Sequence, residues 1–158
     1  MNVAHFHLIV NHLPIVGVLI GALILIVGML LKNMTVKLTA LGVLVFSAIT
    51  SIFAFYTGEG AEEIVESLSS ANHDLIHIHE EYAETFFIMM LILGVVALLG
   101  FIAELKKSTN AKYLVIVSLL GSIACIIMAK YVGTSGGEIR HTEIRSDFRI
   151  DQKSIEED

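Results

Sequence analysis

Long apolar stretches separated by short polar segments make up most of the chain. Each holds about 17–19 consecutive residues without a charged side chain, close to the ~20 residues that cross a 30 Å hydrocarbon core as a helix. A buried helix of a soluble protein rarely needs apolar residues on every face over such a length. The pattern therefore predicts an all-α fold, an integral membrane four-helix bundle, with spans at residues 13–31, 38–56, 85–103 and 113–132.

The polar segments divide the chain into a four-transmembrane-helix domain, residues 1–145, and an acidic C-terminal tail, residues 146–158. Between the second and third spans, apolar residues recur at helical spacing from Glu59 to Leu68, which predicts a short amphipathic helix. No Pro or Gly follows His73 until Gly94, so the third helix is expected to begin near His73 and to enter the membrane near Thr85. These segments predict a polar helical cap at one end of the bundle.

Composition agrees with a membrane protein. Of the 158 residues, 55% are hydrophobic and 16% are charged, against roughly 25% charged in an average soluble domain. The net charge of −6 argues against a nucleic-acid partner, which needs a basic face. Cys125 is the single cysteine, so no disulfide can form within the chain. The segment from Met1 to His12 lacks Lys and Arg and precedes a long apolar run, so we expect the first span not to be a cleaved signal peptide.

The placement of lysines predicts the orientation. Lys32 and Lys37 lie in the first connection, and Lys106, Lys107 and Lys112 lie in the third. Short connections rich in Lys and Arg stay in the cytoplasm, and these two fall on the same side of the membrane if the four spans alternate. We therefore expect a multi-pass protein of the bacterial plasma (inner) membrane with both termini and the polar cap on the non-cytoplasmic side.

The histidines all fall on this predicted outer side. His79 is expected to point into the bundle, whereas His73 and His77 share a hydrated face of the same helix. His7 and His12 flank the start of the first span, but a separation of five residues turns them about 140° apart on a regular helix.

Carboxylates and a glycine pair accompany the histidines. A carboxylate near the membrane surface is costly to bury unless it is paired, protonated or bound to a cation. Gly136 and Gly137 permit a tight turn or a close approach of the backbone, and Arg140 beside His141 offers a donor for an anion. The acidic candidates are Glu59, Glu62, Glu63 and Glu80.

The order of these short motifs resembles a family of small bacterial four-helix membrane domains without an assigned function. The likeness consists of HxxxxHxP at the first span, Thr-Gly after the second, a His leading into the third and a GGE…RH segment after the fourth, and it extends to about Ile144. Some members of that family are joined to Rieske-type or cytochrome c domains, which implies that the membrane domain handles electrons. The matched positions are His7, His12, Thr57, Gly58, His79, Gly136, Gly137, Arg140 and His141.

A b-type haem protein for electron transfer is the first functional hypothesis. Four-helix bundles hold haem between histidines on different helices, which supply the two axial nitrogens. His12 and His79 would form the axial pair, and His7 and His141 would hold a second haem or orient the first. Arg140 or Lys130 would pair with the propionates.

Two other classes stay open at this point. One is a non-haem centre of iron, zinc, manganese or copper with an oxidoreductase or metal-handling role, because mixed His and Glu ligands suit these metals. Its ligands would come from His12, Glu59, Glu62, Glu63, His79, Glu80 and His141. The other is a non-catalytic membrane subunit. The sequence also leaves open a redox partner protein on the outer face and a homo-oligomer in the lipid bilayer.

Overall fold

The computed structural model describes residues 2–66 and 73–145 and confirms the all-α fold. Four helical segments of this described part, Val3–Leu30, Met34–Val65, His73–Leu105 and Ala111–Arg140, are long and apolar enough to cross a membrane. The acidic tail, residues 146–158, lies outside the described residues. The elements in chain order are α1 (Val3–Val10), α2 (His12–Leu30), α3 (Met34–Glu66), α4 (His73–Leu105), α5 (Ala111–Arg140) and the 3-10 helix η1 (Thr142–Ile144).

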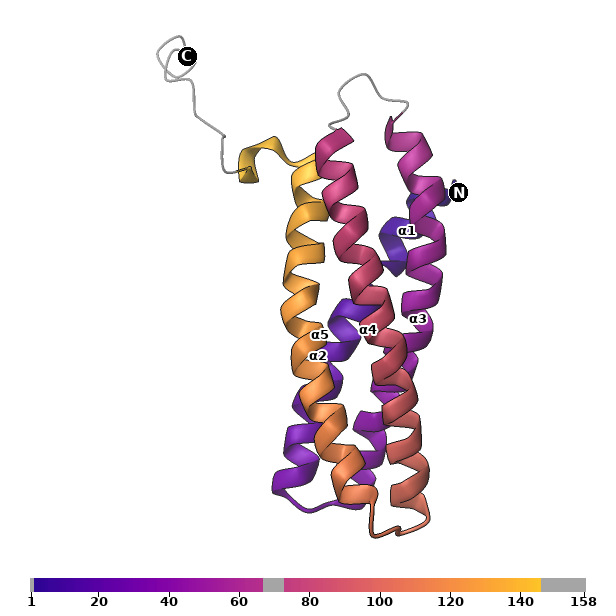
Figure 1. Ribbon diagram of the computed structural model, residues 1–158, viewed down its shortest axis with the longest axis vertical. Coiled ribbons are helices and arrows are strands. Elements are labelled where there is room, and N and C mark those ends of the chain that lie inside the picture. Colours follow the sequence, from indigo (N-terminus) through magenta and orange to yellow (C-terminus); the bar gives the residue numbers. More distant parts are fainter. Residues whose placement is uncertain (1, 67–72, 146–158) are drawn as a thin grey trace.

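The long helices form an antiparallel bundle. Helix α2 packs on α3, α3 on α4 and α4 on α5, and α2 also contacts α5, which closes the bundle (Figure 1). The short helix α1 packs mainly on α3, near the end of the bundle that carries the chain's N-terminus. Helices α3, α4 and α5 extend beyond the apolar spans at this end, and α1 lies beside the polar end of α3.

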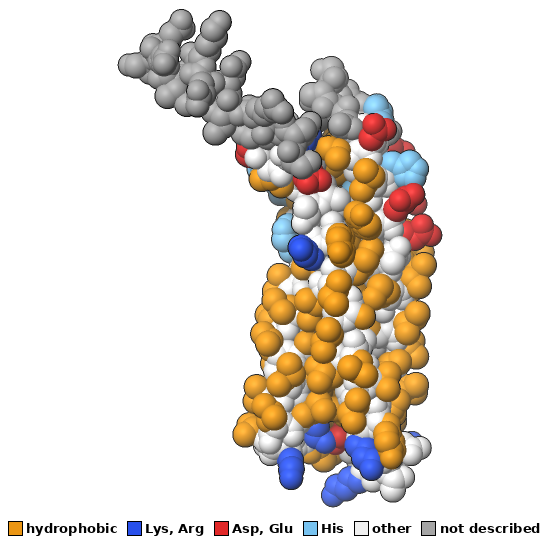
Figure 2. Space-filling view, turned by 60° about the vertical axis from the view of Figure 1, so that its left-hand side comes forward, with side chains coloured by type: hydrophobic (Ala, Val, Ile, Leu, Met, Phe, Trp, Pro, Cys, Tyr) orange, Lys and Arg blue, Asp and Glu red, His pale blue; other side chains and the backbone are white. Residues whose placement is uncertain are grey.

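The outside of the bundle is apolar. Leu30, Ile92 and Leu120 are 77%, 61% and 61% exposed, and hydrophobic side chains cover most of the visible length of the bundle (Figure 2). Lysines gather at one end, while histidines and carboxylates gather at the other (Figure 2). An apolar exterior of this extent suits lipid as the solvent, since exposing so large an apolar surface to water would have a high cost.

The interior combines large apolar side chains with small polar ones. Leu25, Leu41 and Met90 are fully buried. The hydroxyl of Ser47 donates to the carbonyl of Val43 at 2.8 Å, and other buried serines of the bundle bond to their own helices in the same way. Each of these hydroxyls is satisfied within one helix, so the small side chains allow neighbouring helices to pack closely.

Glycines set the closest contacts between helices. A Cβ built at Gly17 of α2 would lie 2.2 Å from Oγ of Ser47 on α3. A Cβ at Gly94 of α4 would lie 2.4 Å from Cβ of Ala48 on α3. A methyl group at Gly94 would force α3 and α4 apart, and one at Gly17 would require the Ser47 side chain to move.

The lysine end of the bundle closes with two similar turns. Lys32 and Lys107 follow the ends of α2 and α4 with positive φ angles of 51°, a conformation that terminates helices. Between these turns, Lys37 of α3 forms an ion pair with Glu104 of α4, whose side chain is 8% exposed. This pair joins two helices at the membrane boundary and neutralises a carboxylate that burial would otherwise penalise.

Two local expectations are corrected. Helix α3 continues without a break from the second span to Glu66, so the described part of the segment from Glu59 is not a separate amphipathic helix; Leu68 lies outside the described residues. Helix α5 continues to Arg140, so Gly136 and Gly137 do not form a tight turn. In both places backbone hydrogen bonding carries the membrane helix beyond its apolar stretch into the polar end of the bundle.

Substitution of Gly94 by Ala is expected to destabilise the bundle by about 1–3 kcal/mol, because the new methyl group would overlap Ala48. The measurement is unfolding of the purified protein in mixed detergent micelles, followed by circular dichroism. Gly133→Ala is the matched control, since a Cβ at Gly133 meets no atom of the described residues within 4 Å. Equal stability of the two variants would contradict the close contact between α3 and α4.

Candidate functional site

His7 is held on α1 by groups of α3. Its side chain is half-buried, and Nδ1 lies 3.1 Å from the carbonyl oxygen of Ala54 and 3.1 Å from Oγ1 of Thr57. The Thr57 hydroxyl donates its own hydrogen to the carbonyl of Phe53 at 2.7 Å. Both groups near Nδ1 therefore act as acceptors, so Nδ1 of His7 carries the proton and Nε2 of the neutral ring carries the lone pair.

His79 is held on α4 in the same manner by α5. Its Nδ1 lies 3.0 Å from Oγ of Ser135, a buried residue. The Ser135 hydroxyl donates to the carbonyl of Val132 at 3.2 Å, so it accepts from His79. His79 thus has the same tautomer as His7, with the lone pair on Nε2.

A glycine stands beside each imidazole. A Cβ built at Gly58 of α3 would lie 3.7 Å from Cε1 of His7, which is an ordinary contact. A Cβ built at Gly136 of α5 would lie 3.0 Å from Cε1 of His79, which is closer than real Cβ contacts usually come. Gly136 therefore makes the room that the His79 ring occupies, and this is the close backbone approach expected of that glycine.

The two imidazoles lie at the same end of the bundle. A charge on His7 would act on His79, although the residues lie on different helices and far apart in the sequence. The side chain of Asn11 lies one helical turn after His7, on the same side of the chain. Its Oδ1 atom is buried and, among residues 2–66 and 73–145, has no hydrogen-bond partner. The outer end of the bundle thus contains two half-buried imidazoles and an unsatisfied carbonyl oxygen.

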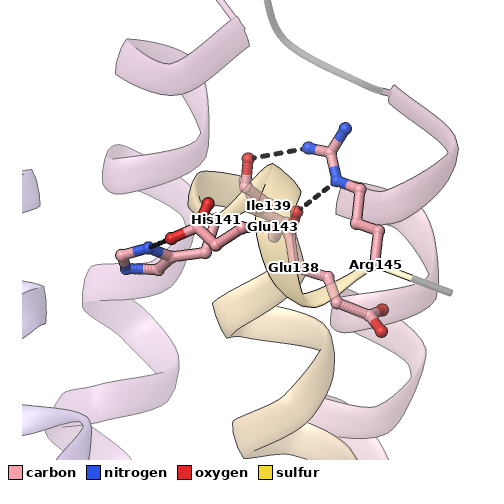
Figure 3. Close-up of polar contacts among 5 residues, drawn as sticks. All are labelled: Glu138, Ile139, His141, Glu143 and Arg145. Carbon is pink, nitrogen blue, oxygen red and sulfur yellow. Dashed lines mark hydrogen bonds and ion pairs between the residues drawn. The ribbon is translucent and has the colours of Figure 1, made fainter. Parts of the chain in front are cut away.

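The other expected histidine ligands are exposed. A charge on His12 would act on His7, but the His12 side chain is exposed, unlike that of His79. His141 is also exposed and donates from Nδ1 to the carboxylate of Glu143 at 2.9 Å (Figure 3). The backbone N–H of Glu143 and the hydrogen bond from His141 lower the pKa of this carboxyl.

The end of α5 is completed by an arginine that the sequence pattern does not single out. Arg145 donates to the carbonyls of Glu138 at 2.8 Å and Ile139 at 3.3 Å, as Figure 3 shows. These carbonyls belong to the last turn of the helix and lack intrahelical partners, so Arg145 caps α5. Arg140, the expected anion-binding residue, is exposed.

The carboxylates do not assemble into a metal site in the described part of the chain. Glu59, Glu63 and Glu80 are exposed, and Glu62 is half-buried. No group of three or more His, Cys, Asp or Glu residues within residues 2–66 and 73–145 is arranged to hold a metal ion.

Sequence reasoning identified His79 as the internal residue of its helix but did not select His7 over His12. The sequence contains a relevant signal in Thr57 and Gly58, since an adjacent hydroxyl and glycine can hold and accommodate a ring. The sequence does not say which histidine this pair faces, because that depends on how α1 packs against α3.

Comparison with known proteins finds no similar protein. No protein-family model, no curated protein and no solved structure matches the chain. The function proposed below is therefore inferred from the side chains that the fold brings together.

Proposed function

We propose that the protein binds a b-type haem through His7 and His79 and transfers electrons at the outer rim of the membrane. The observation that carries this proposal is a pair of partly buried imidazoles on α1 and α4, each held through Nδ1, of which one would feel a charge on the other. Haem iron in helical bundles takes two axial imidazole nitrogens from different helices. The Nε2 lone pairs of His7 and His79 are of the required chemical type.

The donor set fits haem better than a bare metal ion. A non-haem metal needs three or more protein ligands, whereas a porphyrin supplies four of the six ligands of its iron. The described residues offer two internal imidazoles and no larger cluster. This supports haem over the non-haem His and Glu centre that the sequence had left open.

The surroundings of the rings also bear on a bound prosthetic group. Gly58 and Gly136 allow the two imidazoles to lie close to the backbones of α3 and α5, and the unsatisfied Asn11 oxygen offers a polar contact. Arg140 follows Gly136 by one helical turn, so it is the cation nearest in sequence for pairing with a carboxylate of the ligand.

The residues around the ligands would orient them and adjust their basicity. The carbonyl of Ala54 and the hydroxyls of Thr57 and Ser135 accept the Nδ1 protons, and such contacts fix the orientation of a ligating ring. When bound, haem supplies one-electron chemistry by cycling between the ferric and ferrous states. The protein itself contributes the ring positions, the hydrogen bonds and the partly buried surroundings.

We also propose that this site faces the non-cytoplasmic side of a bacterial inner membrane. Five lysines lie at the opposite end of the bundle, in or beside the two short connections that the positive-inside rule assigns to the cytoplasm (Figure 2): Lys32, Lys37, Lys106, Lys107 and Lys112. The resemblance noted above includes His7, Thr57, Gly58, His79 and Gly136, so it supports a common role for these residues. The Rieske and cytochrome c domains joined to members of that family suggest a redox partner protein on the same side.

Replacement of either proposed ligand by Ala is expected to remove the Soret band of the purified protein. Loss of a direct ligand should exceed the roughly 10- to 100-fold loss of metal affinity typical of substitutions around a metal site. The measurement is Soret absorbance per mole of protein for His7→Ala and His79→Ala, with folding checked by circular dichroism and size-exclusion chromatography. His12→Ala and His77→Ala are the controls and should retain the band. A wild-type protein without haem, or full retention of haem in both ligand variants, would overturn the proposal.

Substitution of Gly136 by Ala is expected to weaken haem binding about tenfold, because the added methyl group displaces the His79 ring. The affinity can be measured by titrating haem into the cofactor-depleted protein. Gly133→Ala, on the same helix and without neighbours among the described residues, should bind haem as the wild type does. Equal affinities for the two variants would show that the position of His79 does not matter for the cofactor.

A further inference from the structure

Two open hollows lie along the contact between helices α4 and α5. The outer one has a volume of about 260 Å³ and the inner one about 160 Å³. Exposed side chains border both, including Tyr131 and Ile92, so both open toward the surrounding lipid. The outer hollow reaches the polar end of the bundle, and the inner one lies within the apolar span.

The two hollows lie along the same side of the contact between α4 and α5, which is called the groove below. On α4, their lining residues Ile78, Tyr82, Met89 and Val96 recur at intervals that keep them on one face of the helix. Helix α5 runs antiparallel to α4, and its lining residues also share one face. Tyr131 contacts Tyr82 near the outer hollow, and Gly121 lies beside Leu93 near the inner one. Tyr82 and Ile92 are separated by about 15 Å along the helix at 1.5 Å per residue.

The chemistry changes along this groove. The inner hollow is lined by apolar side chains and Gly121. The outer hollow contains two aromatic rings, those of Tyr82 and Tyr131, with centroids 5.6 Å apart and planes inclined by 39°. It also contains an ammonium group, a hydroxyl and a carboxylate, from Lys130, Thr134 and Glu138. A ligand that matches both hollows has a flat, polar ring and a long apolar tail.

We propose that the groove binds an isoprenoid quinone, with its ring in the outer hollow and its tail in the inner one. Lys130 and Thr134 can donate hydrogen bonds to quinone carbonyls, and Glu138 can accept one from a hydroquinone hydroxyl. A phospholipid fits less well, because its phosphate would pair with Lys130 but would be repelled by the carboxylate of Glu138 in the same hollow. The hollow therefore carries a mixed charge that suits a neutral head group.

A shared residue connects the groove to the proposed haem site. Ser135 lines the outer hollow and accepts a hydrogen bond from Nδ1 of His79. If the proposed function holds, on which this step rests, the quinone pool is the electron donor of the site. Oxidation of one hydroquinone breaks two O–H bonds and releases two electrons and two protons. Haem held by His7 and His79 would supply a one-electron acceptor for each of these electrons in turn, a one-electron carrier protein on the outer side would take them on, and water would take the protons.

Photolabelling tests the groove independently of haem. The probe is an azido-benzoquinone with an isoprenoid tail, added to the detergent-solubilised full chain, and the labelled peptides are identified by mass spectrometry. Saturable labelling of α4 and α5 is expected, and unlabelled quinone should compete with it while phospholipid should not. Absence of saturable labelling, or competition by phospholipid alone, would overturn the inference.

Matched variants locate the two parts of the ligand. Tyr131→Leu should weaken competition by unlabelled quinone about tenfold, the effect of losing one well-packed aromatic contact. Tyr113→Leu, which removes an exposed tyrosine at the other end of α5, should leave it unchanged. Ala124 lines the inner hollow, so Ala124→Phe should weaken binding of the long-tailed quinone but not of tetramethylbenzoquinone, which has no tail. Leu120 is exposed and does not line the hollow, so Leu120→Phe should leave the binding of both quinones unchanged. Uniform behaviour of all four variants would contradict the assignment.

The two proposals can fail separately. Labelling of the groove in a protein without a Soret band would leave the quinone site intact and overturn the haem proposal. A Soret band without saturable labelling would overturn the quinone site alone. In a haem-containing protein, anaerobic hydroquinone should reduce the wild type faster than Tyr131→Leu, while dithionite should reduce both equally.

Discussion

The requirement that lipid replace water around the bundle determines most of this structure. Backbone polar groups must be satisfied within each helix, because the hydrocarbon core offers no other partners. Buried serine hydroxyls donate hydrogen bonds to carbonyls of their own helices for the same reason. With large apolar side chains turned outward, the helices associate through close packing at small residues such as Gly17 and Gly94. Within residues 2–66 and 73–145, charged side chains lie toward the two ends.

This separation creates the polar end in which the candidate site lies. Helices α3, α4 and α5 continue beyond their apolar stretches, and α1 lies beside the polar end of α3. Each internal imidazole is then held by a neighbouring helix, His7 by α3 and His79 by α5. Ser135 belongs both to this arrangement and to the groove between α4 and α5, so one hydroxyl connects the two proposed binding regions.

The fold was largely predictable from the sequence, since length and absence of charge are sufficient to identify a membrane helix. The expected start of α4 near His73 and the inward orientation of His79 also agree with the structure. Contacts between helices were harder to predict from the sequence. The ion pair of Lys37 with Glu104 joins residues far apart in the sequence, and periodicity alone does not pair them.

The choice between His7 and His12 shows the same difficulty. On one regular helix the two rings would point about 140° apart. The helix is interrupted at Asn11, between α1 and α2, so the position of His7 depends on how α1 packs against α3. Gly136 was open to two interpretations for a related reason. A glycine permits a turn or a close contact, and only the position of the His79 ring distinguishes them.

The central claim is that His7 and His79 bind the same iron atom. The most direct measurement is the electron paramagnetic resonance spectrum of the oxidised, purified protein at low temperature. Two axial imidazoles predict a low-spin ferric haem signal. A high-spin signal, or the absence of any haem signal from protein produced with sufficient haem, would contradict the account.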